Sequence, residues 1–332
     1  MSRTSGTILF LAFLLAFDAN PVAGVEFGVQ LAPEKLDYDS LRRAFQLVER
    51  LGYESVWLND HFLPLQGDED DPHFETWTLL PALGKATQKI RVGVLVSGNT
   101  YRHPAVLAKM AATVDHILGG RLEFGIGAGW AEREHRAYGI PFYTARERAE
   151  RLGEALETIL RLWTRDRADF RGRYYRLEDA PFAPKPLQRP HPPIVVGGQG
   201  RKWILPLVAR YADEWNVPVG IDPEGIRARK EILHAECQRV GRTPCVERIS
   251  VMLPLVHMSG LPLAEPLTRL YARTFYSEGV ARSLLAGSPE SIRERIRAYV
   301  DAGVTRIVVT TRPRFAPELL ERFAREVVPA FR

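Results

Sequence analysis

An aspartate and a histidine stand side by side at Asp60 and His61, one residue after the short apolar segment 55–58. An imidazole titrates near neutral pH, so this histidine can donate or accept a proton during a reaction. The plainer interpretation is a loop histidine that caps a helix or orders a turn. A position at the end of a strand favours chemistry, and the pair is the leading acid–base candidate of the sequence.

A glycine-rich turn is the second candidate, and it lies between a Pro-rich apolar segment and an expected helix. Its backbone N–H groups can face a ligand without obstruction by side chains, and the start of a helix adds partial positive charge. Such a turn can hold a phosphate, although glycine is also required in tight turns for its backbone dihedrals. The turn consists of Gly197, Gly198, Gln199 and Gly200, followed by Arg201 and Lys202.

A further glycine-rich stretch, GIGAGW at residues 125–130, resembles a dinucleotide-binding fingerprint. Its spacing is G-x-G-x-G rather than G-x-G-x-x-G, and it follows the fourth expected strand instead of the first. We therefore interpret Gly127 and Gly129 as lining a planar ring at a strand end, with close packing inside the fold as the alternative.

Composition and charge exclude several other classes of function. The formal charge is +5, but the basic residues are scattered, which argues against nucleic-acid binding and suits an anionic ligand. The histidines lack the spacing of zinc ligands, so no metal site is expected. The two cysteines, Cys237 and Cys245, are too few for a disulfide framework or a metal cluster, and we expect only an ordinary structural role at a helix end and in the loop after it.

The elements that must position these residues follow one repeated order. A strand is followed by a loop, an amphipathic helix and a glycine. Expected strands cover residues 25–31, 55–58, 90–96, 122–126, 193–196, 214–217, 248–256 and 304–310. Expected helices cover residues 40–51, 75–87, 105–118, 146–163, 201–211, 223–240, 288–303 and 317–331. Eight apolar strands that alternate with helices predict a single α/β domain, a closed (β/α)8 or TIM barrel of parallel strands.

Two segments interrupt the pattern, and insertions on the C-terminal rim of the barrel are expected. Residues 170–186 predict a hairpin followed by a Pro-rich approach, and residues 258–285 predict a lid or an extra helix. Catalytic groups of such barrels come from the C-terminal ends of the strands. The candidates above, together with Ser97 and Asn99 after the third strand, all fall at such ends.

The first 24 residues do not fit the barrel pattern. Residues 8–17 are an apolar run of signal-peptide length, too short to span a bilayer as a helix. We expect residues 1–24 to be an N-terminal extension from a mis-assigned start, and residues 25–332 to form the barrel of a cytoplasmic protein. A genuine export signal is the alternative.

Several motifs together resemble the luciferase-like flavin superfamily, most closely its branch of coenzyme F420-dependent oxidoreductases. The resemblance covers about residues 25–331. The motifs are VEFGVQL, SVWLNDHF, YRHPAVLAKMAATVDHILGGRLEFGIGAGW, EHRAYGIPF, PPIVVGGQGRK and YADEWN.

This resemblance implies that a deazaflavin lies across the strand ends with its phosphate on the turn at residues 197–200. It places Asp60 and His61 near the ring, with His61 as proton donor to the substrate. It also implies a non-prolyl cis peptide bond in the third strand, which we map to Leu95–Val96, with Val96–Ser97 as second choice. These residues and Asn99 are expected to bind the cofactor.

The residue after the fourth-strand glycines has a further implication. Some deazaflavin relatives carry a glutamate there as proton donor, whereas this chain has Trp130. The tryptophan argues against a sugar-phosphate dehydrogenase and favours an apolar or aromatic substrate surface.

Three functions remain open at this stage. The first is hydride transfer between F420 and an unidentified organic substrate. The second is a two-component monooxygenase that uses FMNH2 and dioxygen and depends on a flavin reductase. The third is a non-catalytic deazaflavin-binding protein. In each case we expect a homodimer that binds small molecules and neither nucleic acid nor a membrane.

Overall fold

The computed structural model describes residues 24–65, 67–259, 264–275, 278–311 and 315–332. The expected extension at residues 1–24 lies outside this part of the chain, apart from Gly24. None of the helices in the described ranges is long and apolar enough to cross a membrane.

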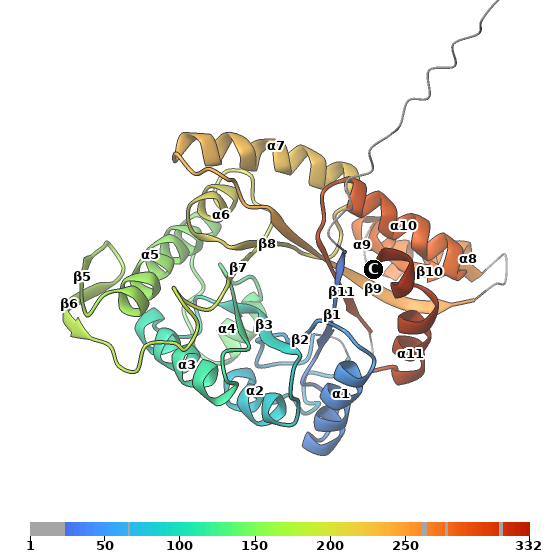
Figure 1. Ribbon diagram of the computed structural model, residues 1–332, viewed down its shortest axis with the longest axis horizontal. Coiled ribbons are helices and arrows are strands. Elements are labelled where there is room, and N and C mark those ends of the chain that lie inside the picture. Colours follow the sequence, from blue (N-terminus) through green and yellow to red (C-terminus); the bar gives the residue numbers. More distant parts are fainter. Residues whose placement is uncertain (1–23, 66, 260–263, 276–277, 312–314) are drawn as a thin grey trace, which may run out of the picture.

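Within the described residues, eight parallel strands close into a barrel (Figure 1), which confirms the predicted (β/α)8 fold. The ring closes because β9 pairs with both β8 and β11. Strands such as β2 and β8 are buried at every position, since side chains fill the barrel on one face and helices cover the other. The strands are β1 (Glu26–Leu31), β2 (Ser55–Leu58), β3 (Arg91–Gly98), β4 (Leu122–Gly127), β7 (Ile194–Gly197), β8 (Glu214–Val217), β9 (Arg248–Met258) and β11 (Arg306–Thr310).

Helices surround the barrel and bury their apolar faces against it. Side chains cap the starts of helices: Asp37 accepts from the backbone N–H of Ser40, and Ser288 from that of Ser291. The outer helices are α1 (Tyr38–Arg50), α2 (Thr76–Lys85), α3 (Pro104–Ile117), α5 (Ala145–Thr164), α6 (Leu205–Tyr211), α7 (Pro223–Arg239), α10 (Pro289–Asp301) and α11 (Pro317–Glu326), with a short 3-10 helix, η1 (Val328–Phe331), after the last.

Helix α6 begins at Leu205, not at residue 201 as predicted. The backbone N–H groups of Ile204 and Leu205 both donate to the carbonyl oxygen of Gly200. Residues 201–204 therefore form a turn that extends the glycine-rich loop, and the helix starts only after it.

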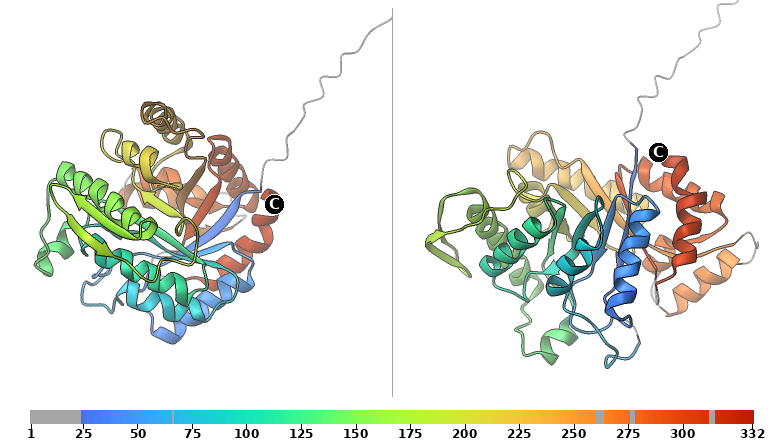
Figure 2. Two further views of the ribbon diagram at one scale, coloured as in Figure 1. Left: turned by 60° about the vertical axis from the view of Figure 1, so that its left-hand side comes forward. Right: turned by 60° about the horizontal axis from the view of Figure 1, so that its bottom comes forward.

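The two predicted insertions are present. Strands β5 (Arg167–Arg171) and β6 (Arg176–Pro181) form an antiparallel hairpin beside α5 (Figure 2). After β9 come α8 (Ala264–Phe275), α9 (Glu278–Ser283) and β10 (Leu285–Gly287), which pairs with the end of β9. A further short helix, α4 (Glu132–Ala137), follows β4 and was not predicted.

Contrary to our expectation, the two cysteines pair with each other in a disulfide. Cys237 lies in the last turn of α7 and Cys245 in the loop that follows, with 5.5 Å between their Cα atoms. The chain reverses at the helix end, where the N–H of Arg242 donates to the carbonyl of Cys237. This reversal returns the second cysteine to the first after eight residues, a contact that cysteine number and spacing alone do not reveal.

A buried ion network closes the end of the barrel interior opposite the strand C-termini. Arg306 on β11 contacts the carboxylate of Glu123 on β4 at 2.5 Å and that of Glu214 on β8 at 3.0 Å. Burial alone would raise the pKa of Glu123, but Arg306, Arg91 and Arg248 lower it to about 2. Burial raises the pKa of Glu214, which is held less closely. The network therefore joins β4, β8 and β11 near their N-terminal ends.

Candidate active site

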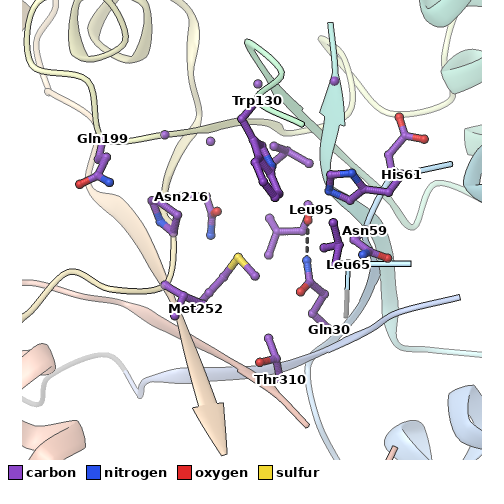
Figure 3. A pocket seen from close by; sticks show the side chains of 18 of the residues that line it. Gln30, Asn59, His61, Leu65, Leu95, Trp130, Gln199, Asn216, Met252 and Thr310 are labelled. Atoms are coloured by element: carbon purple, nitrogen blue, oxygen red, sulfur yellow. Dashed lines mark hydrogen bonds between the residues drawn. The ribbon is translucent and has the colours of Figure 1, made fainter. Parts of the chain in front are cut away.

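A cavity of about 780 Å³ opens at the C-terminal ends of the barrel strands (Figure 3). Every barrel strand contributes lining residues at or near its end, as expected for the functional face of this fold. The predicted site residues that line it are Asp60, His61, Leu95, Val96, Ser97, Gly127, Gly129, Trp130, Gly197, Gly198 and Gln199.

Two predicted cofactor residues do not line this cavity. Asn99 is buried after β3, where its side-chain nitrogen lies 3.5 Å from the hydroxyl of Tyr175 and its side-chain oxygen lacks a partner among the described residues. Gly200 is not among the lining residues, and its carbonyl oxygen accepts from the backbone N–H groups of Ile204 and Leu205.

His61 is held by a carboxylate that the sequence analysis did not single out. Its ring nitrogen Nδ1 lies 2.6 Å from Oε1 of Glu134, which comes from the unexpected helix α4. Within the described residues, the other ring nitrogen, Nε2, has no hydrogen-bond partner, and the ring itself lines the cavity. The indole of Trp130 stands edge-on to the imidazole, with 5.4 Å between ring centroids. The imidazole is therefore anchored at one nitrogen and available at the other.

Glu134 is buried yet remains a carboxylate. Burial would raise its pKa, but hydrogen bonds from His61, from the backbone of Phe62 and from the hydroxyl of Tyr101 hold it below the usual range. Burial and the bond to Glu134 raise the pKa of Tyr101, so its hydroxyl keeps its proton and donates it in a hydrogen bond. One carboxylate thus joins the loops after β2, β3 and β4.

Asp60 pairs with a different residue, Arg102. Its two carboxylate oxygens accept from the guanidinium of Arg102 at 2.6 and 3.0 Å, and Arg102 also pairs with Glu75. Burial raises the pKa of Asp60, while Arg102 opposes that rise. Both oxygens are occupied, so the arrangement leaves proton transfer to His61 and gives Asp60 a supporting role.

The peptide bond between Leu95 and Val96 is cis, at the position that we mapped first. The side-chain nitrogen of Gln30 donates to the carbonyl oxygen of Leu95 at 2.5 Å (Figure 3). The methyl groups of Val96 lie against Gly127 and Gly197, where an added Cβ would come within 2.9 Å of them. These glycines therefore make room for the bulge that forms the floor of the cavity, which supports the packing interpretation for Gly127.

The glycine-rich turn lies across the cavity from His61, and Figure 3 shows Gln199 on the opposite side. The carbonyl oxygen of Gly198 accepts from the indole of Trp215 at 2.7 Å, which fixes the turn to β8. In the described part of the chain, the backbone N–H groups of residues 199–203 donate to no acceptor. The guanidinium of Arg229 contacts Gln199. Burial lowers the pKa of Arg229, and the nearby positive charge of Arg201 lowers it further. Free donors and cations together favour an anion here.

Asn59 presents an unpartnered amide to the same cavity. Its side chain is 3% exposed, and neither its nitrogen nor its oxygen has a partner among the described residues. A buried amide without partners is costly, so it indicates a ligand or water that supplies them. Elsewhere the wall is mainly apolar, with side chains from the loop after β2, from β9, from α8 and α9 and from the residue after α9: Leu65, Met252, Pro254, Val256, Ala272, Val280 and Leu284.

Glu134, Tyr101, Gln30 and Asn59 are the residues that sequence reasoning missed. Glu134 is the first residue of the motif EHRAYGIPF that carries the family resemblance, but its contact with His61 could not be inferred without α4, a helix of 6 residues that was not predicted. Asn59 was adjacent to the chosen pair, at the same strand end, and its polar type at a buried position was the available signal.

Comparisons with known proteins agree on one family. Residues 21–260 match the model of the luciferase-like monooxygenases. An FMNH2-dependent dimethylsulfone monooxygenase of Pseudomonas putida is 31% identical, over 89% of this chain and 88% of its own. An F420-dependent glucose-6-phosphate dehydrogenase of Amycolatopsis mediterranei is 28% identical, over 86% of this chain and 92% of its own.

Solved structures show the same fold. An F420-dependent secondary alcohol dehydrogenase, in complex with an F420–acetone adduct, superposes with a TM-score of 0.81 at 20% identity. The match covers 93% of this chain and 99% of that one.

Proposed function

Because this chain belongs to the luciferase-like monooxygenase family, whose matched members are F420- or flavin-dependent enzymes, we propose that it is an F420-dependent oxidoreductase. It would transfer a hydride between the deazaflavin and an organic substrate. The observation that carries the proposal is the cavity itself, which His61 and Gln199 line from opposite sides, with the free N–H donors of residues 199–203 in the turn that begins at its edge.

The residues present fit such a cofactor. The free backbone N–H groups at residues 199–203, with Arg201 and Arg229 beside them, would hold its phosphate. The cis bulge at Leu95–Val96 would support one face of a flat ring, and the amide of Asn59 offers an NH2 group and a carbonyl oxygen to the ring's polar edge. When bound, the deazaflavin supplies the site that gives or takes the hydride.

The chain's own contribution is proton transfer, orientation and exclusion of water. His61 would exchange a proton with the substrate oxygen at Nε2, a contribution that typically accelerates a reaction by about 10²–10⁴-fold. Glu134 and Trp130 hold the imidazole from two sides. The apolar wall from β9, α8 and α9 keeps the space above the floor dry.

We propose that the substrate lies between Trp130 and this apolar wall. The indole is 66% exposed at the mouth of the cavity, so it offers a flat aromatic surface. An apolar or aromatic substrate suits this surface better than the sugar phosphate named for one relative.

An FMNH2-dependent monooxygenase is the second candidate, and the 31% identity to the dimethylsulfone monooxygenase favours it. That function would need dioxygen and a flavin reductase as partner. The third possibility, a non-catalytic binder, is set aside because the similar proteins described above are enzymes.

Turnover under controlled oxygen separates the two enzyme functions. Purified protein is incubated with reduced F420 or with FMNH2 and a panel of apolar carbonyl compounds. Our proposal expects anaerobic, acceptor-dependent oxidation of reduced F420. Product formation only with FMNH2 and dioxygen would support the monooxygenase instead.

Two further proposals concern the setting of the enzyme. We propose a homodimer and a cytoplasmic location. Size-exclusion chromatography with light scattering tests the first, and fractionation of the native host tests the second.

A further inference from the structure

We infer that Glu134 is a positioning residue that fixes the tautomer of His61, so that the neutral ring presents an unprotonated Nε2 to the cavity. This inference concerns the protein alone. It can hold or fail whichever cofactor the enzyme uses, and its test therefore does not depend on the proposed function.

The geometry leaves the carboxylate little freedom. Glu134 is 2% exposed, and its Oε2 accepts from the backbone N–H groups of Phe62 at 2.7 Å and Leu63 at 3.4 Å. Its Oε1 accepts from the hydroxyl of Tyr101 and faces Nδ1 of His61 at 2.6 Å. The two carboxylate oxygens of Glu134 thus face four potential hydrogen-bond donors.

Each of these bonds has a fixed direction. Backbone N–H groups can only donate, so Oε2 must accept. A carboxylate that stays ionised has no hydrogen to give, so Nδ1 of His61 must carry the proton that joins it to Oε1. In the neutral imidazole the other nitrogen then bears a lone pair. That nitrogen is the one left without a partner among the described residues.

The consequence is a direction for the chemistry. With Nε2 unprotonated, neutral His61 accepts a proton from a substrate hydroxyl, the O–H bond breaking as the Nε2–H bond forms. The carboxylate of Glu134 then faces an imidazolium, which it stabilises. In the opposite direction the imidazolium returns this proton to the substrate oxygen. His61 would thus act as a base in its neutral state and as an acid only once charged.

Glu134→Gln should reverse the tautomer. The side-chain carbonyl of glutamine must turn toward the N–H groups of Phe62 and Leu63, because two donors facing its amide nitrogen would repel it. The amide NH2 group then faces Nδ1 of His61, which can only accept. The ring proton is therefore displaced to Nε2.

The control is Tyr101→Phe, which removes one donor to the same carboxylate but leaves an acceptor facing His61. This variant should keep the wild-type tautomer. The two variants disturb the same site, so a difference between them reports the acceptor and not general loosening.

Nitrogen-15 NMR of histidine-labelled protein reads the tautomer directly, without cofactor or substrate. The His61 signals are assigned by their loss in His61→Gln, and spectra are recorded at rising pH until the ring is neutral. We expect proton attachment at Nδ1 in the wild type and in Tyr101→Phe, and at Nε2 in Glu134→Gln. A wild-type ring protonated at Nε2, or a Glu134→Gln ring still protonated at Nδ1, would overturn the inference. If Glu134→Gln does not fold, the wild-type and Tyr101→Phe spectra still decide it.

Discussion

The guanidinium of Arg102 binds both carboxylate oxygens of Asp60, across 42 residues of sequence, at 2.6 and 3.0 Å. Asp60 was predicted as a catalytic partner of its neighbour His61, and the two side chains turn out to serve different networks. His61 contacts Glu134, while Asp60, which also lines the cavity, neutralises the cation of Arg102. Adjacent residues in sequence thus have separate tasks.

Asp60→Ala should lower the free energy of unfolding by about 3–5 kcal/mol, since it leaves a mostly buried arginine without its main partner. Urea denaturation at neutral pH measures this change. Asp39→Ala is the matched control, because Asp39 pairs with Arg42 on the exposed surface of α1 and should leave stability unchanged. Equal effects of the two substitutions would refute the buried-pair account.

His61→Gln should separate chemistry from binding. The variant should retain cofactor affinity within about threefold, because the anchoring groups lie across the cavity, while turnover falls by about 10²–10⁴-fold. Fluorescence titration of F420 and steady-state kinetics give the two quantities. His234→Gln, at an exposed position of α7, is the control. Loss of binding with unchanged turnover per bound cofactor would contradict the assigned role.

Gly198→Asp should weaken cofactor binding by roughly tenfold or more relative to Gly198→Asn, because a carboxylate beside a phosphate is repelled. The comparison uses asparagine because Gly198 has a φ of 135°, where any L side chain is strained. Both variants share that strain, and only one carries charge. The difference should shrink as salt is added. Equal affinities of the two variants would place the phosphate elsewhere.

The ion network below the barrel predicts a specific acid sensitivity. The pKa of Glu123 is lowered to about 2, so its stabilising effect is fully present above its ordinary value of 4.5 and is lost as the pH falls through about 2. Glu123→Gln should cost about 3–5 kcal/mol at pH 7, and this cost should diminish toward pH 2. Urea denaturation across this range measures it, with Glu318→Gln on the surface of α11 as control. A cost that does not vary with pH would show that charge is not its cause.

The barrel could be predicted because its signals are local and repeated. Apolar strands, amphipathic helices and glycines after helices recur along the chain, and all eight strands were placed. The cis bond at Leu95–Val96 came from the family resemblance instead, since no local pattern in those residues indicates it.

The partners of the site residues could not be predicted for a physical reason. Glu134 lies 73 residues from His61, and their contact depends on how α4 folds back over the rim. Likewise, the pairing of Arg102 with Asp60 requires the loop after β3 to turn toward β2. Strand ends are readable from sequence, whereas contacts between rim loops are set by tertiary packing. The predicted start of α6 was wrong for a related reason. Gly200 accepts two hydrogen bonds that form a turn, and the helix begins only after this turn.

The identity of the bound cofactor tests the central claim most directly. Purified protein with the full cavity intact is titrated separately with F420 and with FMN by isothermal calorimetry, at matched ionic strength. Our account predicts saturable, stoichiometric binding of F420 that is weakened in Gly198→Asp relative to Gly198→Asn, with FMN binding at least tenfold more weakly. Tight binding of FMN with no binding of F420 would contradict it.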